Sequence, residues 1–407
     1  MTRQFTGMVF NHLEKILEPC SQDEFINSVW GKSYRHVRGR AGKFSELLPW
    51  DQLNKILRQH RLDFPRLRLT RDGKSLPASD YLRHTTPARR KVSIPHLKHA
   101  QLTEQLRAGA TLVLDAVDEL YEPLTDLAES LELFFHEHIQ INCYAGWRTS
   151  RGFDLHWDDH DVFILQVTGR KRWSVYGMTR PFPLSQDAEQ AQKPEHEPLW
   201  EGTLEDGDLL YIPRGWWHVA FPLDEPTLHL TVGVHNRTGL DLLRWVSDKM
   251  RASEIFRKDL PRFTSDAERA AHVSELRREF LDQWDDAELL KRFFDEQDAV
   301  AEARACLSLP WSAASEVLPS SNQTLVRWLA PRPLEFKTEN GVVEFSCQKK
   351  RWRFSADALL VLRPLAERRV CSVALLCEAA RGKIEEQTVR AFLCELILHG
   401  LLAVVSG

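Results

Sequence analysis

Alternation of apolar and polar residues dominates the middle of the chain. It is seen in 139–144 and 162–167, and further strand-like runs follow at 171–176, 208–212 and 227–233, separated by glycine, proline and other turn residues. Strands at such regular intervals predict a barrel or a double-sheet jelly roll over about 136–236. In the last run His229, Thr231 and Gly233 share one face, and apolar side chains occupy the other. Polar residues on one face are what we expect of strands that line a site.

Helical periodicity appears in the regions on either side. Residues 51–57 carry the apolar stripe of a helix, and residues 64–70 alternate as an exposed strand does. After Asn236 the chain becomes charged and helical over 239–305, with a second amphipathic run from Ala267 to Arg304. The first of these helices has its apolar positions at Leu240, Leu243, Val246 and Met250. Such a stripe lying outside a barrel needs a partner.

The last hundred residues form a separate small unit in this interpretation, after a linker near 310–323. Asn340-Gly341 predicts a hairpin over 334–345, Ser355 and Ser372 can each cap a helix, and a helix over 385–399 ends before Gly400. A hairpin beside helices of this length favours a winged helix. The predicted fold is therefore α+β, with domain limits at 1–238, 239–308 and 309–407.

Composition narrows the function classes. The 407 residues carry a formal net charge of −4, which gives no global basic field for nucleic acid. Seven cysteines without C-x-x-C spacing argue against a disulfide framework or a zinc ribbon and favour a reducing, cytoplasmic location. No apolar run marks a signal peptide or a membrane span. The basic run 349–353 is read as a solvated face, so we expect protein or peptide recognition there rather than nucleic-acid binding.

The motif with the clearest chemistry is His156-Trp157-Asp158, which is answered downstream by His218 in Gly215-Trp-Trp-His. On extended backbone His156 and Asp158 project to one face, which Asp159 cannot do. His160 shares that parity but lies further along. Two imidazoles and one carboxylate on one face suit Fe(II) with open coordination positions. H-x-D also arises by chance, but the strands and turns around both halves favour the metal interpretation.

The segments 158–173 and 205–218 resemble the cupin-type JmjC oxygenases. More narrowly they resemble the ribosomal oxygenase group, whose members hydroxylate histidine or arginine side chains of ribosomal proteins. The motifs match over about 140–237, and the order of barrel, helical dimerisation segment and winged helix resembles that group over nearly the whole chain. The resemblance implies Fe(II) on His156, Asp158 and His218, 2-oxoglutarate as cosubstrate, and a homodimer through residues 240–305.

The resemblance also implies roles for other residues. Lys171, thirteen residues after Asp158, would pair with the far carboxylate of 2-oxoglutarate, unless Arg170-Lys171-Arg172 is only a surface basic run. The remaining residues assigned to the cosubstrate are Asn142 and Thr231, and those assigned to the substrate are Tyr144, Trp157, His160 and His229. The small hydroxyl residue that the family often has near Gly233 is missing from this chain.

The predicted function is Fe(II)- and 2-oxoglutarate-dependent hydroxylation of an amino-acid side chain in a protein, with a ribosomal protein as the expected substrate. The same motifs would serve a peptide natural product, a nucleoside or the removal of an N-methyl group. The alternative from another class is a non-catalytic cupin that keeps its metal and acts as a regulator.

Overall fold

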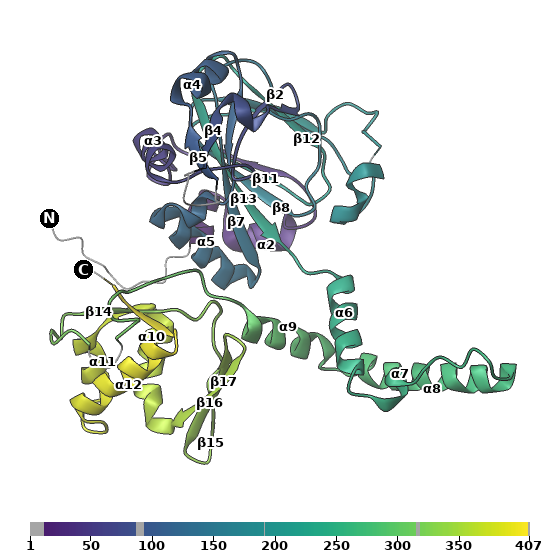
Figure 1. The fold of residues 1–407 in the computed structure, drawn as a ribbon, viewed down its shortest axis with the longest axis vertical. Coiled ribbons are helices and arrows are strands. Elements are labelled where there is room, and N and C mark those ends of the chain that lie inside the picture. The colour runs from purple at the N-terminus through teal and green to yellow at the C-terminus, as the bar shows by residue number, and fades with distance from the viewer. Residues whose placement is uncertain (1–11, 87–92, 191, 315–317, 406–407) are drawn as a thin grey trace. The chain divides into compact units, whose positions relative to one another are not determined.

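The computed structural model describes residues 12–86, 93–190, 192–314 and 318–405. It divides the chain into two compact units, one ending at Asn236 and one beginning at Arg237 (Figure 1). No helix in these described ranges is both long and apolar enough to cross a membrane.

Two antiparallel sheets form the framework of the first unit. Their strands are β1 (Arg35–Val37), β2 (Leu67–Arg71), β3 (Lys74–Ser75), β6 (Thr111–Leu114), β7 (His138–Gly146), β8 (Asp161–Thr168), β9 (Lys171–Val175), β10 (Trp200–Leu204), β11 (Leu209–Ile212), β12 (His218–Pro222) and β13 (Thr227–His235). The larger sheet has the order β1-β11-β8-β13-β7-β6-β2-β3, and the smaller sheet has the order β10-β9-β12. A separate pair joins β4 (Leu82–Thr85) to β5 (Ile94–Leu97).

Strand alternation gives the larger sheet two different faces. Phe163 and Leu165 of β8 belong to the main core, which the helices of this unit cover. Val162 and Ile164 point the other way and pack against Trp173 of the smaller sheet. The helices are α1 (His12–Leu17), α2 (Gln22–Ser28), α3 (Trp50–Gln59), α4 (His99–Arg107) and α5 (Glu122–Phe135). Two sheets packed face to face in this way form the predicted jelly roll.

One predicted element differs from the structure. Residues 64–70 were expected to form an exposed strand, but Leu67 and Leu69 are fully buried. The reason is that the face of β2 that carries both leucines packs into the main core, while β2 pairs with β6 and β3 inside the larger sheet. Alternation shows that a strand has one apolar and one polar face, but it does not show whether the polar face contacts solvent or another part of the protein.

The second unit begins with helices α6 (Gly239–Met250), α7 (Glu254–Arg257), α8 (Asp266–Trp284) and α9 (Leu289–Val300). Val246 and Met250 of the predicted stripe are buried, whereas Leu240 and Leu243 are each 42% exposed. The run expected over Ala267–Arg304 is interrupted after Trp284. The carboxylate of Asp286 accepts the backbone N–H of Glu288 at 2.9 Å, which gives the chain a local alternative to continued helix.

The rest of this unit has a core of its own. Its elements are β14 (Leu325–Trp328), β15 (Lys337–Glu339), β16 (Val342–Cys347), β17 (Lys350–Ser355), α10 (Leu359–Arg368), β18 (Val370–Ser372), α11 (Val373–Ala379), α12 (Glu386–Leu398) and β19 (Leu402–Val405). The hairpin turn at Asn340-Gly341 is as predicted, because Glu339 pairs with Val342. Ser372 caps α11 through its hydroxyl, whereas Ser355 makes no such side-chain bond.

Candidate active site

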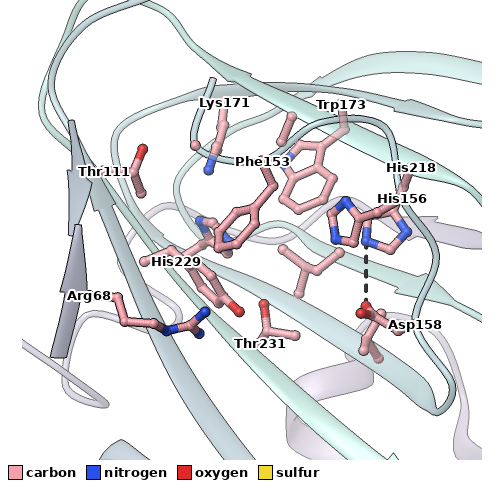
Figure 2. A pocket seen from close by; sticks show the side chains of 15 residues that line it. Arg68, Thr111, Phe153, His156, Asp158, Lys171, Trp173, His218, His229 and Thr231 are labelled. Carbon is pink, nitrogen blue, oxygen red and sulfur yellow. Dashed lines mark ion pairs between the residues drawn. The ribbon is translucent and has the colours of Figure 1, made fainter. Parts of the chain in front are cut away.

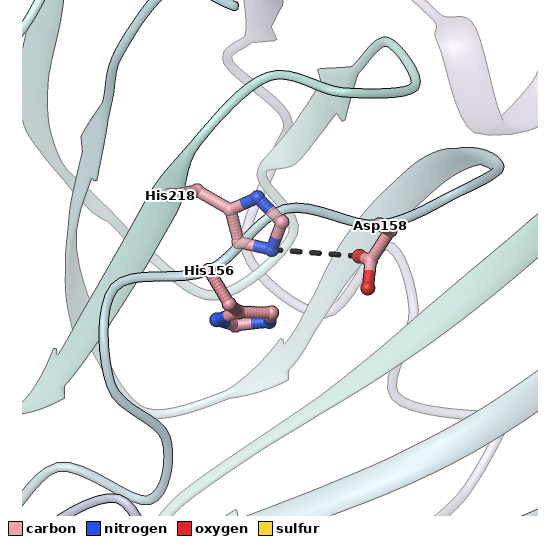
Figure 3. Close-up of side chains that lie close together, drawn as sticks. All are labelled: His156, Asp158 and His218. Atoms are coloured by element: carbon pink, nitrogen blue, oxygen red, sulfur yellow. Dashed lines mark ion pairs between the residues drawn. The ribbon is translucent and has the colours of Figure 1, made fainter. Parts of the chain in front are cut away.

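His156, Asp158 and His218 converge on one point in the jelly roll (Figure 3). One ligand atom from each lies within 4.8 Å of the other two. Nε2 of His218 is 3.5 Å from Oδ2 of Asp158, and the two imidazole centroids are 4.4 Å apart. The three residues that the sequence selected therefore form one cluster.

The backbone fixes this cluster. His156 and His218 form an isolated β-bridge in which each backbone N–H donates to the other residue's carbonyl, at 3.2 and 2.7 Å. The backbone N–H of Gly215 donates to the carbonyl of Asp158 at 2.9 Å. Gly215 has a φ of +81°, and a Cβ there would lie 2.4 Å from Cδ of Pro183. Only glycine fits this turn, which carries His218 to its place.

Hydrogen bonds also set the tautomer of each histidine. Nδ1 of His156 lies 2.7 Å from the carbonyl oxygen of Asp154, and Nδ1 of His218 lies 3.1 Å from that of Trp216. A carbonyl can only accept, so each Nδ1 carries the proton. Nε2 of both rings therefore presents a lone pair, as a metal ligand must.

Electrostatics keep the cluster in its ligand form. Burial, assisted by His156, lowers the pKa of His218 to about 4, so this imidazole is neutral at pH 7. Burial opposes ionisation of Asp158, but His218 and His156 outweigh it and hold the pKa of that carboxyl below its usual value. A neutral imidazole and an ionised carboxylate are ready to coordinate a cation.

A cavity of about 240 Å³ opens beside the cluster (Figure 2). His156, Asp158 and His218 line it, together with four more of the predicted residues: Tyr144, Lys171, His229 and Thr231. Asn142, Trp157 and His160 lie in the described part of the chain but outside this lining. Oδ1 of Asn142 instead accepts bonds from the backbone of Ala116 and the side chain of Gln140, each at 2.9 Å.

Lys171 is the buried cation of the cavity. Its side chain points inward from β9, whereas Arg170 is exposed and pairs with Glu225, as strand parity predicts. Burial lowers the pKa of Lys171 to about 7. Its ammonium nitrogen lies 5.6 Å from the centroid of the Trp173 ring, and no described residue forms a hydrogen bond or ion pair with it. A buried cation without an anionic partner is unfavourable, so this position suits a bound anion.

Other polar atoms in the cavity wall also lack partners among the described residues. They are Nε of Arg68, Oγ1 of Thr111, Nε1 of Trp173 and Nδ1 of His229. The ring of His229 is stacked on Tyr144, with centroids 4.9 Å apart and planes 5° from parallel. Because buried polar groups normally have partners, we take these atoms as sites of ligand contact.

Arg68, Thr111 and Phe153 are among the cavity residues that the sequence did not single out. Arg68 projects from β2 and pairs with Asp115 at 2.8 Å. Its signal was present, because alternation in 67–71 places Arg68 opposite the buried leucines. β2 pairs with β6, which in turn pairs with β7, and local pattern does not reveal this pairing.

A protein-family model described as JmjC domain matches residues 118–242, the segment that contains the three clustered residues and Lys171. Residues 118–242 are a JmjC domain. This confirms the family predicted from the motifs.

Curated relatives match this chain over part of their own length. The bifunctional lysine-specific demethylase and histidyl-hydroxylase NO66 of Drosophila pseudoobscura pseudoobscura is 29% identical over 239 residues, which are 55% of this chain and 23% of that protein. Ribosomal oxygenase 1 of Bos taurus is 30% identical over 272 residues, 64% of this chain and 39% of that protein. The chain thus spans less than half the length of these curated relatives.

Solved structures match this chain over more of its length. The ribosomal oxygenase YcfD from Escherichia coli aligns with a TM-score of 0.59 and 20% identity, covering 95% of this chain and 99% of that one. A structure of YcfD in complex with cobalt and 2-oxoglutarate aligns with a TM-score of 0.58 and 19% identity, with the same coverage. At this identity the likeness establishes the fold.

Proposed function

We propose that this JmjC protein is an Fe(II)- and 2-oxoglutarate-dependent oxygenase that hydroxylates a side chain of a protein, with a ribosomal protein as the first candidate. The observation that carries the proposal is that the metal-ligand cluster lines one cavity with Lys171, which has no anionic partner among the described residues. Relatives named ribosomal oxygenase and histidyl-hydroxylase support the substrate class.

His156, Asp158 and His218 would hold Fe(II). The donor set fits, because one nitrogen of each imidazole and one carboxylate oxygen lie within 4.8 Å of one another, and carbonyl oxygens engage both Nδ1 atoms and leave Nε2 for a metal. Three protein ligands on one face leave positions for a chelating cosubstrate and for dioxygen. When bound, iron and 2-oxoglutarate use O2 to insert one oxygen atom into a substrate C–H bond, and release succinate and CO2.

Lys171 and Thr111 would hold the far carboxylate of 2-oxoglutarate. The ammonium of Lys171 supplies the opposite charge, and the hydroxyl of Thr111 supplies a donor that has no partner among the described residues. Thr231 lies in the same wall, and Asn142 is its partner on β7. We propose that these two position the cosubstrate, as the resemblance implies.

The substrate side chain would enter between Tyr144, His229 and the metal. The stacked pair of rings gives this wall a flat apolar surface with a polar rim. Burial raises the pKa of the Tyr144 hydroxyl, assisted by Asp158, so it stays protonated and can donate a hydrogen bond. Trp157 and His160 remain proposed substrate residues outside the cavity lining.

Turnover of 2-oxoglutarate tests this proposal. Purified protein with Fe(II), 2-oxoglutarate and air is expected to release succinate, and His156→Ala is expected to abolish the release. His399→Gln is the matched control, because His399 is a surface histidine that pairs with Glu395 at 3.0 Å. Equal succinate release from the wild type and His156→Ala would overturn the assignment.

We also propose that residues 240–305 form a homodimer contact and that residues 309–407 form a winged helix. Helix α8 has no buried residue along its 19 positions, and apolar side chains along this segment are exposed. They include Leu240, Leu243, Leu260, Phe263, Val273 and Leu290. Exposed apolar surface of this extent is typical of an interface.

Two further features support the proposed partners and location. In the run 349–353, Lys349 pairs with Glu302, and both Arg351 and Arg353 pair with Glu344. These acidic partners weaken the run as a phosphate-binding surface, which supports protein rather than nucleic acid as the partner. All seven cysteines are free thiols, in keeping with the proposed cytoplasmic location.

A further inference from the structure

A second cluster of metal-ligand atoms lies next to the first. Asp159, His160 and His235 each offer one ligand atom, and these atoms lie within 4.8 Å of one another. Oδ1 of Asp159 is 3.0 Å from Nδ1 of His160, and the imidazoles of His160 and His235 are stacked with centroids 4.2 Å apart. The proposed oxygenase chemistry uses Asp158 as the ligand and gives Asp159 and His235 no role; in this neighbouring cluster only His160 has one, as a proposed substrate residue.

The fold brings these residues together from two strands. Asp159 and His160 precede β8, and His235 ends β13, whose Val234 pairs with Asp161 at the start of β8. A Cβ at Gly233 would lie 2.8 Å from the ring of His160. The missing side chain at 233, where the chain departs from the family pattern, is therefore what leaves room for His160.

The surroundings leave the cluster available for an ion. None of the described residues hydrogen-bonds a ring nitrogen of His235. His138 stands opposite His235 on β7, with ring centroids 6.1 Å apart, and its side chain is 68% exposed. The nearby carboxylate of Asp161 is already occupied by Tyr211 at 2.6 Å and by Asn236.

We propose that Asp159, His160 and His235 bind a second divalent transition ion, independently of the first cluster. Two imidazole nitrogens and one carboxylate oxygen suit Zn²⁺, Co²⁺ or Ni²⁺, whereas Mg²⁺ and Ca²⁺ prefer sites built from oxygen alone. His138 or water would complete the coordination. The full chain then binds two such ions when they are in excess.

Counting bound Zn²⁺ tests the proposal directly. The wild-type protein is dialysed against micromolar Zn²⁺, and its zinc content is measured by elemental mass spectrometry. We expect two ions per chain in the wild type, one in Asp158→Ala and one in His235→Gln. His84→Gln is the matched control and should keep two, because His84 pairs with a single carboxylate, that of Asp63, at 2.8 Å.

The outcomes separate this site from the proposed oxygenase site. A single ion in the wild type, or two in His235→Gln, overturns the second site. The loss of one zinc ion from Asp158→Ala, with one ion retained, assigns the lost ion to the first cluster and the retained ion to the second. If His235→Gln does not fold, Gly233→Ser replaces it, because the added side chain displaces His160; two ions in Gly233→Ser would also contradict the proposal.

Discussion

His156 and His218 exchange both backbone hydrogen bonds across a single isolated bridge, although they lie far apart in the sequence. The bridge sets the centroids of the two imidazoles 4.4 Å apart. Asp158 reaches the same point because Gly215 holds its carbonyl. Because the backbone already holds these three side chains together, we expect each of them to contribute strongly to metal affinity.

Asp158→Asn is expected to weaken Fe(II) binding by at least about 100-fold, since even the loss of an outer hydrogen-bond partner costs about 10- to 100-fold. The change keeps the shape of the side chain and removes its charge. The readout is the charge-transfer absorption of the Fe(II)–2-oxoglutarate complex during an iron titration.

Asp154→Asn is the control for this variant. It removes a nearby carboxylate that pairs with Arg151, but keeps the backbone carbonyl that orients His156. Weakening of equal size in both variants would mean that local charge, rather than coordination by Asp158, governs iron binding.

The affinity for 2-oxoglutarate should fall as the pH rises above 7. Burial places the pKa of Lys171 at about 7, so the empty cavity loses its ammonium above that pH, and binding of the dianion must restore it. The dissociation constant is expected to rise about tenfold per pH unit above 7, with uptake of about one proton. Calorimetry in two buffers of different ionisation enthalpy measures that uptake.

Lys171→Arg should bind 2-oxoglutarate without this pH dependence, because a guanidinium stays charged throughout the range. The same steep dependence in Lys171→Arg would show that another group takes up the proton.

Lys171→Met is expected to make the protein more stable while abolishing 2-oxoglutarate binding. Burial in the folded state holds the pKa of Lys171 below its unfolded value. At neutral pH the amine is charged in the unfolded chain, so its burial lowers the free energy of unfolding. Replacing the amine should therefore raise the free energy of unfolding by about 1 kcal/mol, within the range of single stabilising replacements. Thermal melting checks this, and a lower melting temperature in Lys171→Met would contradict it.

Phe263→Glu should convert a dimer into a monomer. Phe263 is 96% exposed in the helical segment, and a charge there would be buried without a partner in any apolar interface. Light scattering at micromolar concentration measures the mass. Leu398→Glu, on α12, is the control because Leu398 is also exposed and lies outside that segment. A monomeric wild type would refute the proposed interface.

The alternation of side chains along strands gave the most accurate predictions of the site. It placed His229 and Thr231 in the cavity wall and Lys171 inward between outward arginines, because strand side chains alternate wherever one face is buried. It failed for Arg68, whose polar face was read as solvent, since the strand that turns that face into a cavity wall is remote in sequence. The position of His160 against Gly233 was also out of reach, because it depends on the pairing of β8 with β13.

The mass of the substrate tests the central claim most directly. Ribosomal proteins from cells that lack this protein would be incubated with it, Fe(II), 2-oxoglutarate and ¹⁸O₂, and then compared by intact-mass and fragment spectra. We predict that one side chain of one protein gains a single oxygen atom derived from O₂, and that His218→Ala prevents the gain. Succinate formation with no labelled oxygen in any ribosomal protein would contradict the proposed substrate class, and an identical gain with His218→Ala would contradict the metal centre.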